Sequence, residues 1–123
     1  MTRPPTARSR RWLLPVVYMA MIFVLSSQPN PAPEVTSRVW DKLLHAGTYA
    51  GLAFLFWRAL TGEGLSWKAA APIAVLLSSA YGVSDEYHQY FVPTRDANAL
   101  DWLADTIGAA FAAGICAMKA SKA

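Results

Sequence analysis

The stretch that decides the fold is Ala69–Ser84, AAAPIAVLLSSAYGVS, which carries no charged residue on any helical face. A second stretch, Trp12–Leu25, reads WLLPVVYMAMIFVL and also lacks charge. A helix of a soluble bundle needs a polar face toward water, and a chain of 123 residues is too short to bury two helices on all sides. Lipid suits both stretches better, so the sequence predicts membrane-spanning helices.

Outward from this stretch, further apolar segments bring the expected number of helices to four. The predicted spans are residues 12–27, 43–60, 65–84 and 102–118. Each is close to, or a little short of, the roughly 20 residues that cross a bilayer core. We therefore predict an all-α polytopic membrane bundle of four transmembrane helices, forming one domain over residues 1–123.

The composition agrees with a membrane environment. Only 15% of the residues are charged, against roughly 25% in an ordinary soluble domain. The mean hydropathy is +0.25. A cleaved signal peptide is the alternative for residues 1–27, but no A-x-A site follows the apolar run. The net charge of +3 does not indicate nucleic acid, because the basic residues form no stripe interleaved with stacking aromatics.

The distribution of Lys and Arg predicts the orientation. With the N-terminus inside, eight of them lie on the cytoplasmic side and three (Arg38, Lys42 and Arg95) on the outer side. Short cytoplasmic loops of bacterial membrane proteins carry such an excess. We therefore expect both termini in the cytoplasm and residues 28–42 and 85–101 outside, in a multi-pass protein of the bacterial inner membrane.

Polar side chains gather at the three predicted helix ends that face outward. On the second helix, Asp41, His45 and Tyr49 are spaced i, i+4 and i+8, and therefore lie along one face. The third helix ends, and the fourth begins, with similarly spaced groups. The candidate ligand-binding residues of this outer cluster are Asp41, Lys42, Tyr49, Glu86, Gln89, Arg95, Asp101 and Asp105, and its candidate catalytic residues are His45, Asp85 and His88.

Two members of the cluster lie where charge is costly. His45 and Asp105 are about one turn inside their helices, where an unpaired charge costs ~2.5 kcal/mol or more, so such residues usually have partners. Helix capping would explain Asp41 and Asp101 without any function. The convergence of all these groups on one side of the membrane favours a site.

Arg95 is the nearest guanidinium to this cluster. Val92-Pro93 favours an extended or turn conformation, which places Arg95 back over the helix ends. We expect Arg95 to contact at least one of the carboxylates Asp85, Glu86 and Asp101, or to bind an anionic head group.

Two segments carry a family likeness. DKLLHAGTYAGLAFL begins at Asp41, and YGVSDEYHQYFVPTRDANALDWLADTIGAAFAAG ends at Gly114. Within them, D-E-x-H-Q-x-F-V-P-x-R and D-x-x-A-D-x-x-G are quite specific, and together they resemble the VanZ-like family of small bacterial membrane proteins. The resemblance implies a multi-helix inner-membrane protein, and the family's founding association is with low-level resistance to teicoplanin. It does not imply a defined enzymatic activity.

Two functions are open at this point. The first is a cell-envelope or glycopeptide-resistance accessory protein, in which Lys42 and Arg95 hold a lipid-linked or cell-wall ligand. The second is a small membrane hydrolase or transferase acting on an envelope lipid, with His45 or His88 as general base and Asp85 or Asp41 orienting it. A metal variant of the second function would use His45, His88 and carboxylates, which suit zinc or a harder divalent ion. The spacing matches no established metal motif, so no metal and no cofactor are expected.

The expected partners are membrane lipids and a lipid-linked cell-wall precursor, without nucleic acid. Gly108 is followed by alanines along the fourth helix, and small residues let helix backbones approach closely in lipid. We expect Gly108 at a helix–helix contact, either within the bundle or across a homo-oligomer.

Overall fold

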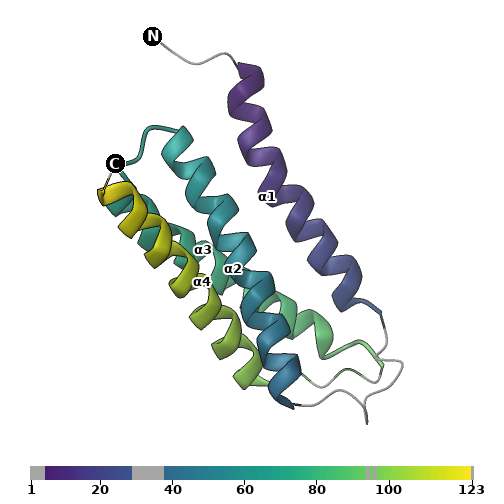
Figure 1. Cartoon of the computed structure of the whole chain (residues 1–123). Coiled ribbons are helices and arrows are strands. Elements are labelled where there is room, and N and C mark those ends of the chain that lie inside the picture. The colour runs from purple at the N-terminus through teal and green to yellow at the C-terminus, as the bar shows by residue number, and fades with distance from the viewer. Residues whose placement is uncertain (1–4, 29–37, 94, 96, 123) are drawn as a thin grey trace.

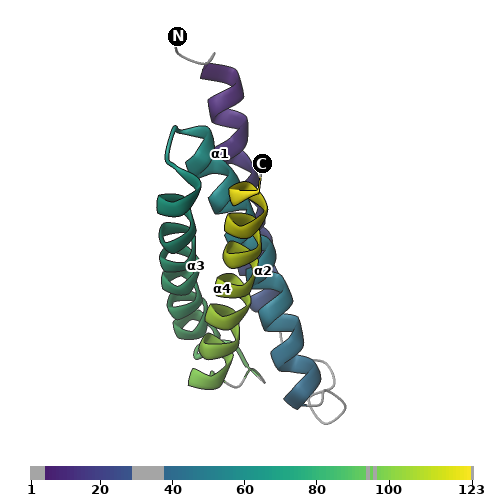
Figure 2. The same ribbon diagram turned by 60° about the vertical axis from the view of Figure 1, so that its left-hand side comes forward.

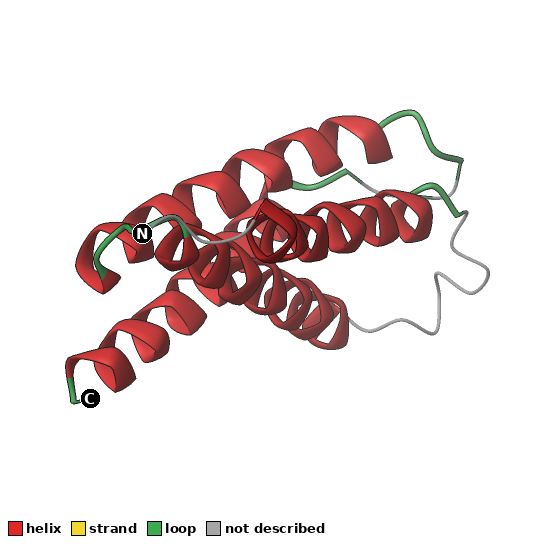
Figure 3. Cartoon of the chain, turned by 90° about the horizontal axis from the view of Figure 1, so that it is seen from above, coloured by secondary structure: helices red, strands yellow, loops and turns green. Residues whose placement is uncertain are grey.

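The computed structural model describes residues 5–28, 38–93, 95 and 97–122. These residues form four α-helices and no strand: α1 (Pro5–Ser26), α2 (Arg38–Gly62), α3 (Trp67–Gln89) and α4 (Ala99–Ser121). Figure 3 shows the same helices joined by loops. The prediction of an all-α chain with four helices is confirmed for this part of the sequence. The predicted outer segment 28–42 lies partly outside the described residues.

The helices are longer than the predicted spans. They contain 22 to 25 residues, which at a rise of 1.5 Å per residue gives lengths of about 33 to 38 Å. The apolar stretches underestimate them because polar residues such as Asp41 and Glu86 continue each helix beyond its apolar part. Each helix is therefore long enough for a hydrocarbon core of about 30 Å.

Local signals fix where the helices begin. Ser66 caps α3 by accepting a hydrogen bond from the amide of Ala69 at 3.1 Å, and Asn98 caps α4 by accepting one from Leu100 at 2.8 Å. The turn between α2 and α3 contains Gly64 at φ 105°, a conformation that L side chains rarely adopt.

Helices α2, α3 and α4 pack closely together, whereas α1 lies against α2 and only touches α3 (Figures 1 and 2). Two tyrosine hydroxyls attach α1 to its neighbours: Tyr18 of α1 donates to the carbonyl of Thr48 on α2 at 2.7 Å, and Tyr81 of α3 donates to the carbonyl of Met19 on α1 at 2.6 Å. The core cluster contains Ile22, Tyr49, Leu52, Phe56, Leu60, Ala70 and Ala74.

Gly108 lies where α2 and α4 cross most closely. A Cβ atom at this position would overlap the carbonyl oxygen of Ala46 and lie 2.6 Å from its carbonyl carbon. The expectation that Gly108 sits at a helix–helix contact is confirmed, and the contact is within the bundle.

The helices alternate in direction. The start of α1, the end of α4 and the turn between α2 and α3 lie at one end of the bundle, and the end of α1, the start of α2, the end of α3 and the start of α4 lie at the other (Figure 1). The polar residues of the outer cluster belong to the end opposite the termini, as the up-and-down order predicts.

Two of the described helices are long and apolar enough to cross a membrane. They are α1, over Ser9–Ser26, and α4, over Ala99–Ser121. Only 17% of the first window and 22% of the second are buried within the bundle. The prediction of membrane helices is thus supported for two of the four, and a bundle of four spans stays a prediction.

Candidate functional site

A histidine–aspartate pair, with the histidine partly buried and the aspartate buried, lies at the centre of the outer cluster. The Nδ1 atom of His45 on α2 is 2.8 Å from Oδ1 of Asp105 on α4, and Asp105 is completely buried. Asp105 stands one turn before Gly108 on the same face of α4, so the close crossing at Gly108 brings Asp105 against His45. The contact between His45 and Asp105 thus depends on the small size of Gly108, which lets the two helices approach.

The other nitrogen of His45 faces two more carboxylates. Its Nε2 atom is 3.8 Å from Oδ2 of Asp101 and 3.9 Å from Oδ1 of Asp41. Lys42 forms an ion pair with Asp101 and lies 3.5 Å from Asp41. Burial opposes the charge of Lys42, but the hydrogen bond and negative charge of Asp101 raise the pKa of Lys42 above its usual range.

Helix α3 contributes Asp85, which is 5% exposed. Tyr49 of α2 donates a hydrogen bond to Oδ2 of Asp85 at 3.3 Å. One turn earlier, Gly82 lets α3 approach Asp105: a Cβ atom at residue 82 would lie 3.1 Å from Oδ2 of Asp105. Three helices therefore bring carboxylates to one place.

Glu86 lies beside this group and is held by the connection into α4. Its Oε2 atom accepts a hydrogen bond from the backbone amide of Asn98 at 2.9 Å. Burial raises the pKa of Glu86 to about 7, although the bond from Asn98 opposes the shift. The second oxygen, Oε1, is buried and accepts no hydrogen bond from any described residue, and the same is true of Oδ2 of Asp105.

A pocket of about 240 Å³ opens next to His45, between α1, α2 and α3. Its walls combine the apolar side chains of Ile22, Leu25 and Leu44 with polar groups. The polar residues that line it are Ser26, Asp41, His45, Thr48, Tyr49, Asp85, Gln89 and Arg95. Small-molecule sites also occur between the helices of bundles, where apolar walls are combined with a few polar groups.

Most of the candidate residues lie at or next to this pocket. Asp41, His45, Tyr49, Asp85, Gln89 and Arg95 line it. Lys42, Asp101 and Asp105 lie behind it, linked to one another through His45 and the Lys42–Asp101 ion pair. Glu86 lies against the start of α4.

His88 lies apart from the pocket. Its Nε2 atom is 2.8 Å from the hydroxyl of Ser27, and its ring stacks on Phe23 with the ring centroids 4.3 Å apart. His88 follows Asp85 by only three residues, but its side chain contacts residues at the end of α1. The two histidines therefore belong to different environments.

The prediction that Arg95 contacts a carboxylate of the cluster is wrong for the described residues. Arg95 donates from Nε to the carbonyl of Gln28 at 2.7 Å and from Nη2 to the carbonyl of Leu25 at 2.9 Å. The last carbonyls of a helix lack partners within the helix, so a guanidinium close to the end of α1 satisfies them. Arg95 still borders the pocket and retains further N–H donors.

The contribution of α1 to the lining of the pocket was not predicted from the sequence. Ile22, Leu25 and Ser26 line the pocket, although α1 lies outside both sequence segments that carry the family likeness. Ser26 is only 6% exposed, and a serine at the end of an otherwise apolar run was the available signal.

Comparison with known proteins gives one match. The model of the VanZ/LLP1 family matches residues 6–120. No curated protein and no solved structure matches the chain. The match spans all four helices, including α1, which the sequence motifs had left outside the likeness. The chain therefore belongs to the VanZ/LLP1 family.

Proposed function

We propose that this chain is an inner-membrane protein of the cell envelope that binds part of a lipid-linked or cell-wall ligand in the pocket at the outer end of its helices. The observation that carries the proposal is the lining of this pocket. Apolar residues of α1 and α2 line it together with polar groups that include Asp85, Gln89 and Arg95. Such a lining fits a ligand that has a polar head and an apolar chain.

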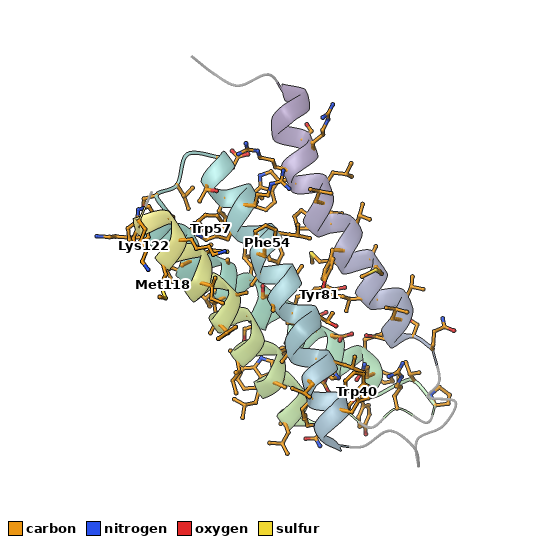
Figure 4. The ribbon with its side chains drawn as sticks, viewed as in Figure 1. Trp40, Phe54, Trp57, Tyr81, Met118 and Lys122 are labelled. Carbon is orange, nitrogen blue, oxygen red and sulfur yellow. The ribbon has the colours of Figure 1, made fainter. Side chains whose placement is uncertain are left out.

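The surface of the bundle supports a membrane location. Large apolar side chains are exposed along every helix: Val17 is 56% exposed, Leu76 69% and Phe111 69%. Exposed apolar area on this scale marks contact with lipid or with other proteins. Trp40 and Trp57 lie toward opposite ends of α2 (Figure 4), as interfacial aromatics do in a spanning helix.

The orientation is tested by labelling single cysteines from outside the cell in a background without Cys116. Asn98→Cys and Ser37→Cys should react with a membrane-impermeant maleimide, and Gly64→Cys should react only after the membrane is opened. Residue 37 lies outside the described part, and its place rests on the Lys and Arg asymmetry. Labelling of Gly64→Cys alone in intact cells would reverse the orientation.

The ligand is tested by lipids that co-purify with the protein. Asp85→Asn and His45→Gln should each remove the bound lipid and reduce teicoplanin tolerance to the level of cells without the protein, because both side chains line the pocket. His88→Gln is the matched control, since His88 lies against Ser27 and Phe23 instead. Retention of lipid and tolerance by both pocket variants would refute the proposal.

A second candidate function is favoured by the His45–Asp105 pair. An aspartate that binds one imidazole nitrogen orients the ring and supports its action as a general base through the other nitrogen. The orienting residue would be Asp105, in place of the Asp85 or Asp41 considered from sequence. Turnover of the co-purified lipid by wild-type protein, lost in His45→Gln, would establish a hydrolase or transferase.

A further inference from the structure

We propose that His45, Glu86 and Asp105 form a binding site for a divalent metal ion, behind the pocket. One possible ligand atom from each residue lies within 4.8 Å of those of the other two. The residues come from α2, α3 and α4, so an ion here would join the three closely packed helices. This proposal does not depend on what the pocket binds.

The first argument is the two buried carboxylate oxygens. Oδ2 of Asp105 and Oε1 of Glu86 accept no hydrogen bond from the described residues. Asp105 is completely buried, so water does not reach it from the surface. A buried carboxylate oxygen without a donor is costly, and a cation is the partner that a carboxylate accepts in place of a donor.

The second argument is the balance of charge. Five carboxylates meet at this end of the bundle, and the cations beside them are already engaged. Lys42 pairs with Asp101 and Asp41, and Arg95 donates to backbone carbonyls of α1. Of the ionisable groups that the structure describes in contact with Asp105, His45 is the one that can carry a positive charge, and it also lies close to Glu86. In a poorly solvated environment, a doubly charged ion removes this excess of negative charge.

Two overlapping groups of residues could hold a metal ion, and the contacts of Lys42 favour one of them. Asp41, His45 and Asp101 also come within the same distance of one another. However, the ammonium of Lys42 already contacts Asp101 and lies near Asp41, so it takes the place of a cation there. In the trio His45, Glu86 and Asp105, by contrast, both carboxylates have a vacant oxygen.

The ligand set indicates a first-row transition metal. An imidazole nitrogen with carboxylate oxygens suits Zn²⁺ or Mn²⁺, whereas Ca²⁺ and Mg²⁺ prefer oxygen ligands alone. Bonds of roughly 2.0–2.2 Å require the three ligand atoms to draw closer by small side-chain rotations. The metal ligand is the neutral imidazole, so an ion that binds to protonated His45 releases one proton to solvent.

The test uses the full chain, purified in detergent, stripped with a chelator and then titrated with Zn²⁺ or Mn²⁺. We expect about one ion per chain by elemental mass spectrometry and a rise in melting temperature of about 5 °C or more. Asp105→Asn and Glu86→Gln should each weaken binding by about tenfold or more, since each removes one charged ligand. Asp85→Asn, a buried carboxylate outside the trio, should bind the metal as the wild type does.

Absence of binding by the wild type, or binding by both trio variants with the affinity of the wild type, overturns the proposal. If the variants do not fold, the X-ray absorption spectrum of zinc bound to the wild type decides. It should show nitrogen and oxygen ligands that include an imidazole. A sulfur ligand, which would come from Cys116, or a spectrum without imidazole, also overturns the site. Loss of lipid from Asp85→Asn without loss of metal would separate this site from the pocket.

Discussion

Gly108→Leu is expected to prevent accumulation of the folded protein. The Cβ atom alone would overlap the backbone of Ala46, and backbone cannot move aside by rotation about a side-chain bond. Helices α2 and α4 would have to separate, and the contact between them is the most extensive in the bundle. Overpacking a core costs 1–3 kcal/mol, occasionally more, and a clash with backbone should reach about 3 kcal/mol or more. Yield and melting temperature in detergent are the measurements.

Gly114→Leu is the matched control for this variant. Gly114 lies on the same helix but is exposed, and a Cβ atom there would meet nothing within 4 Å. The same change in volume and hydrophobicity should therefore leave the melting temperature within a few degrees of the wild type. Equal yields of the Gly108 and Gly114 variants would show that the crossing of α2 and α4 is looser than described.

The sequence predicted the fold because its strongest signals are local. Charge-free runs such as Ala69–Ser84 predict where helices form, and the alternation of loops predicts which ends meet. The predicted start of α2 was too late and the predicted end of α3 too early, because hydropathy falls at Asp41 and Glu86 while the backbone continues as helix. Caps such as Asn98 mark these boundaries better than hydropathy does.

The candidate site was predictable as a group of residues but not as a set of pairs. The spacing of Asp41, His45 and Tyr49 placed them on one face, yet which carboxylate each would meet depends on how α2, α3 and α4 are rotated. That rotation is set in part by Gly108, where the backbone of α2 lies against α4, and by Gly82, where side chains of α4 lie against α3. For the same reason, the sequence did not reveal that His88 and Arg95 turn to the end of α1, since nothing in it shows where α1 docks.

His45→Leu should destabilise the protein by about 3 kcal/mol or more when measured in the presence of a chelator. The change removes the hydrogen bond at 2.8 Å that holds Asp105, whose other oxygen already has no donor among the described residues. Removing one partner of a buried ion pair costs 3–5 kcal/mol, because the remaining charge has neither water nor a counter-ion. The free energy of unfolding is measured by thermal or chemical denaturation in detergent.

The double variant His45→Leu/Asp105→Leu separates this cause from a simple loss of packing. Replacing both members of a buried pair with apolar groups is often nearly neutral, so the second substitution should recover most of the stability lost in the first. His88→Leu is the matched control, since its Nε2 bonds the hydroxyl of Ser27 and leaves no buried carboxylate behind. A small effect of His45→Leu, with a double variant that is merely additive, would mean that Asp105 is neutral when buried. In that case Asp105 would not need His45 as a counter-ion, and the pair would owe its position to the close crossing of α2 and α4 alone.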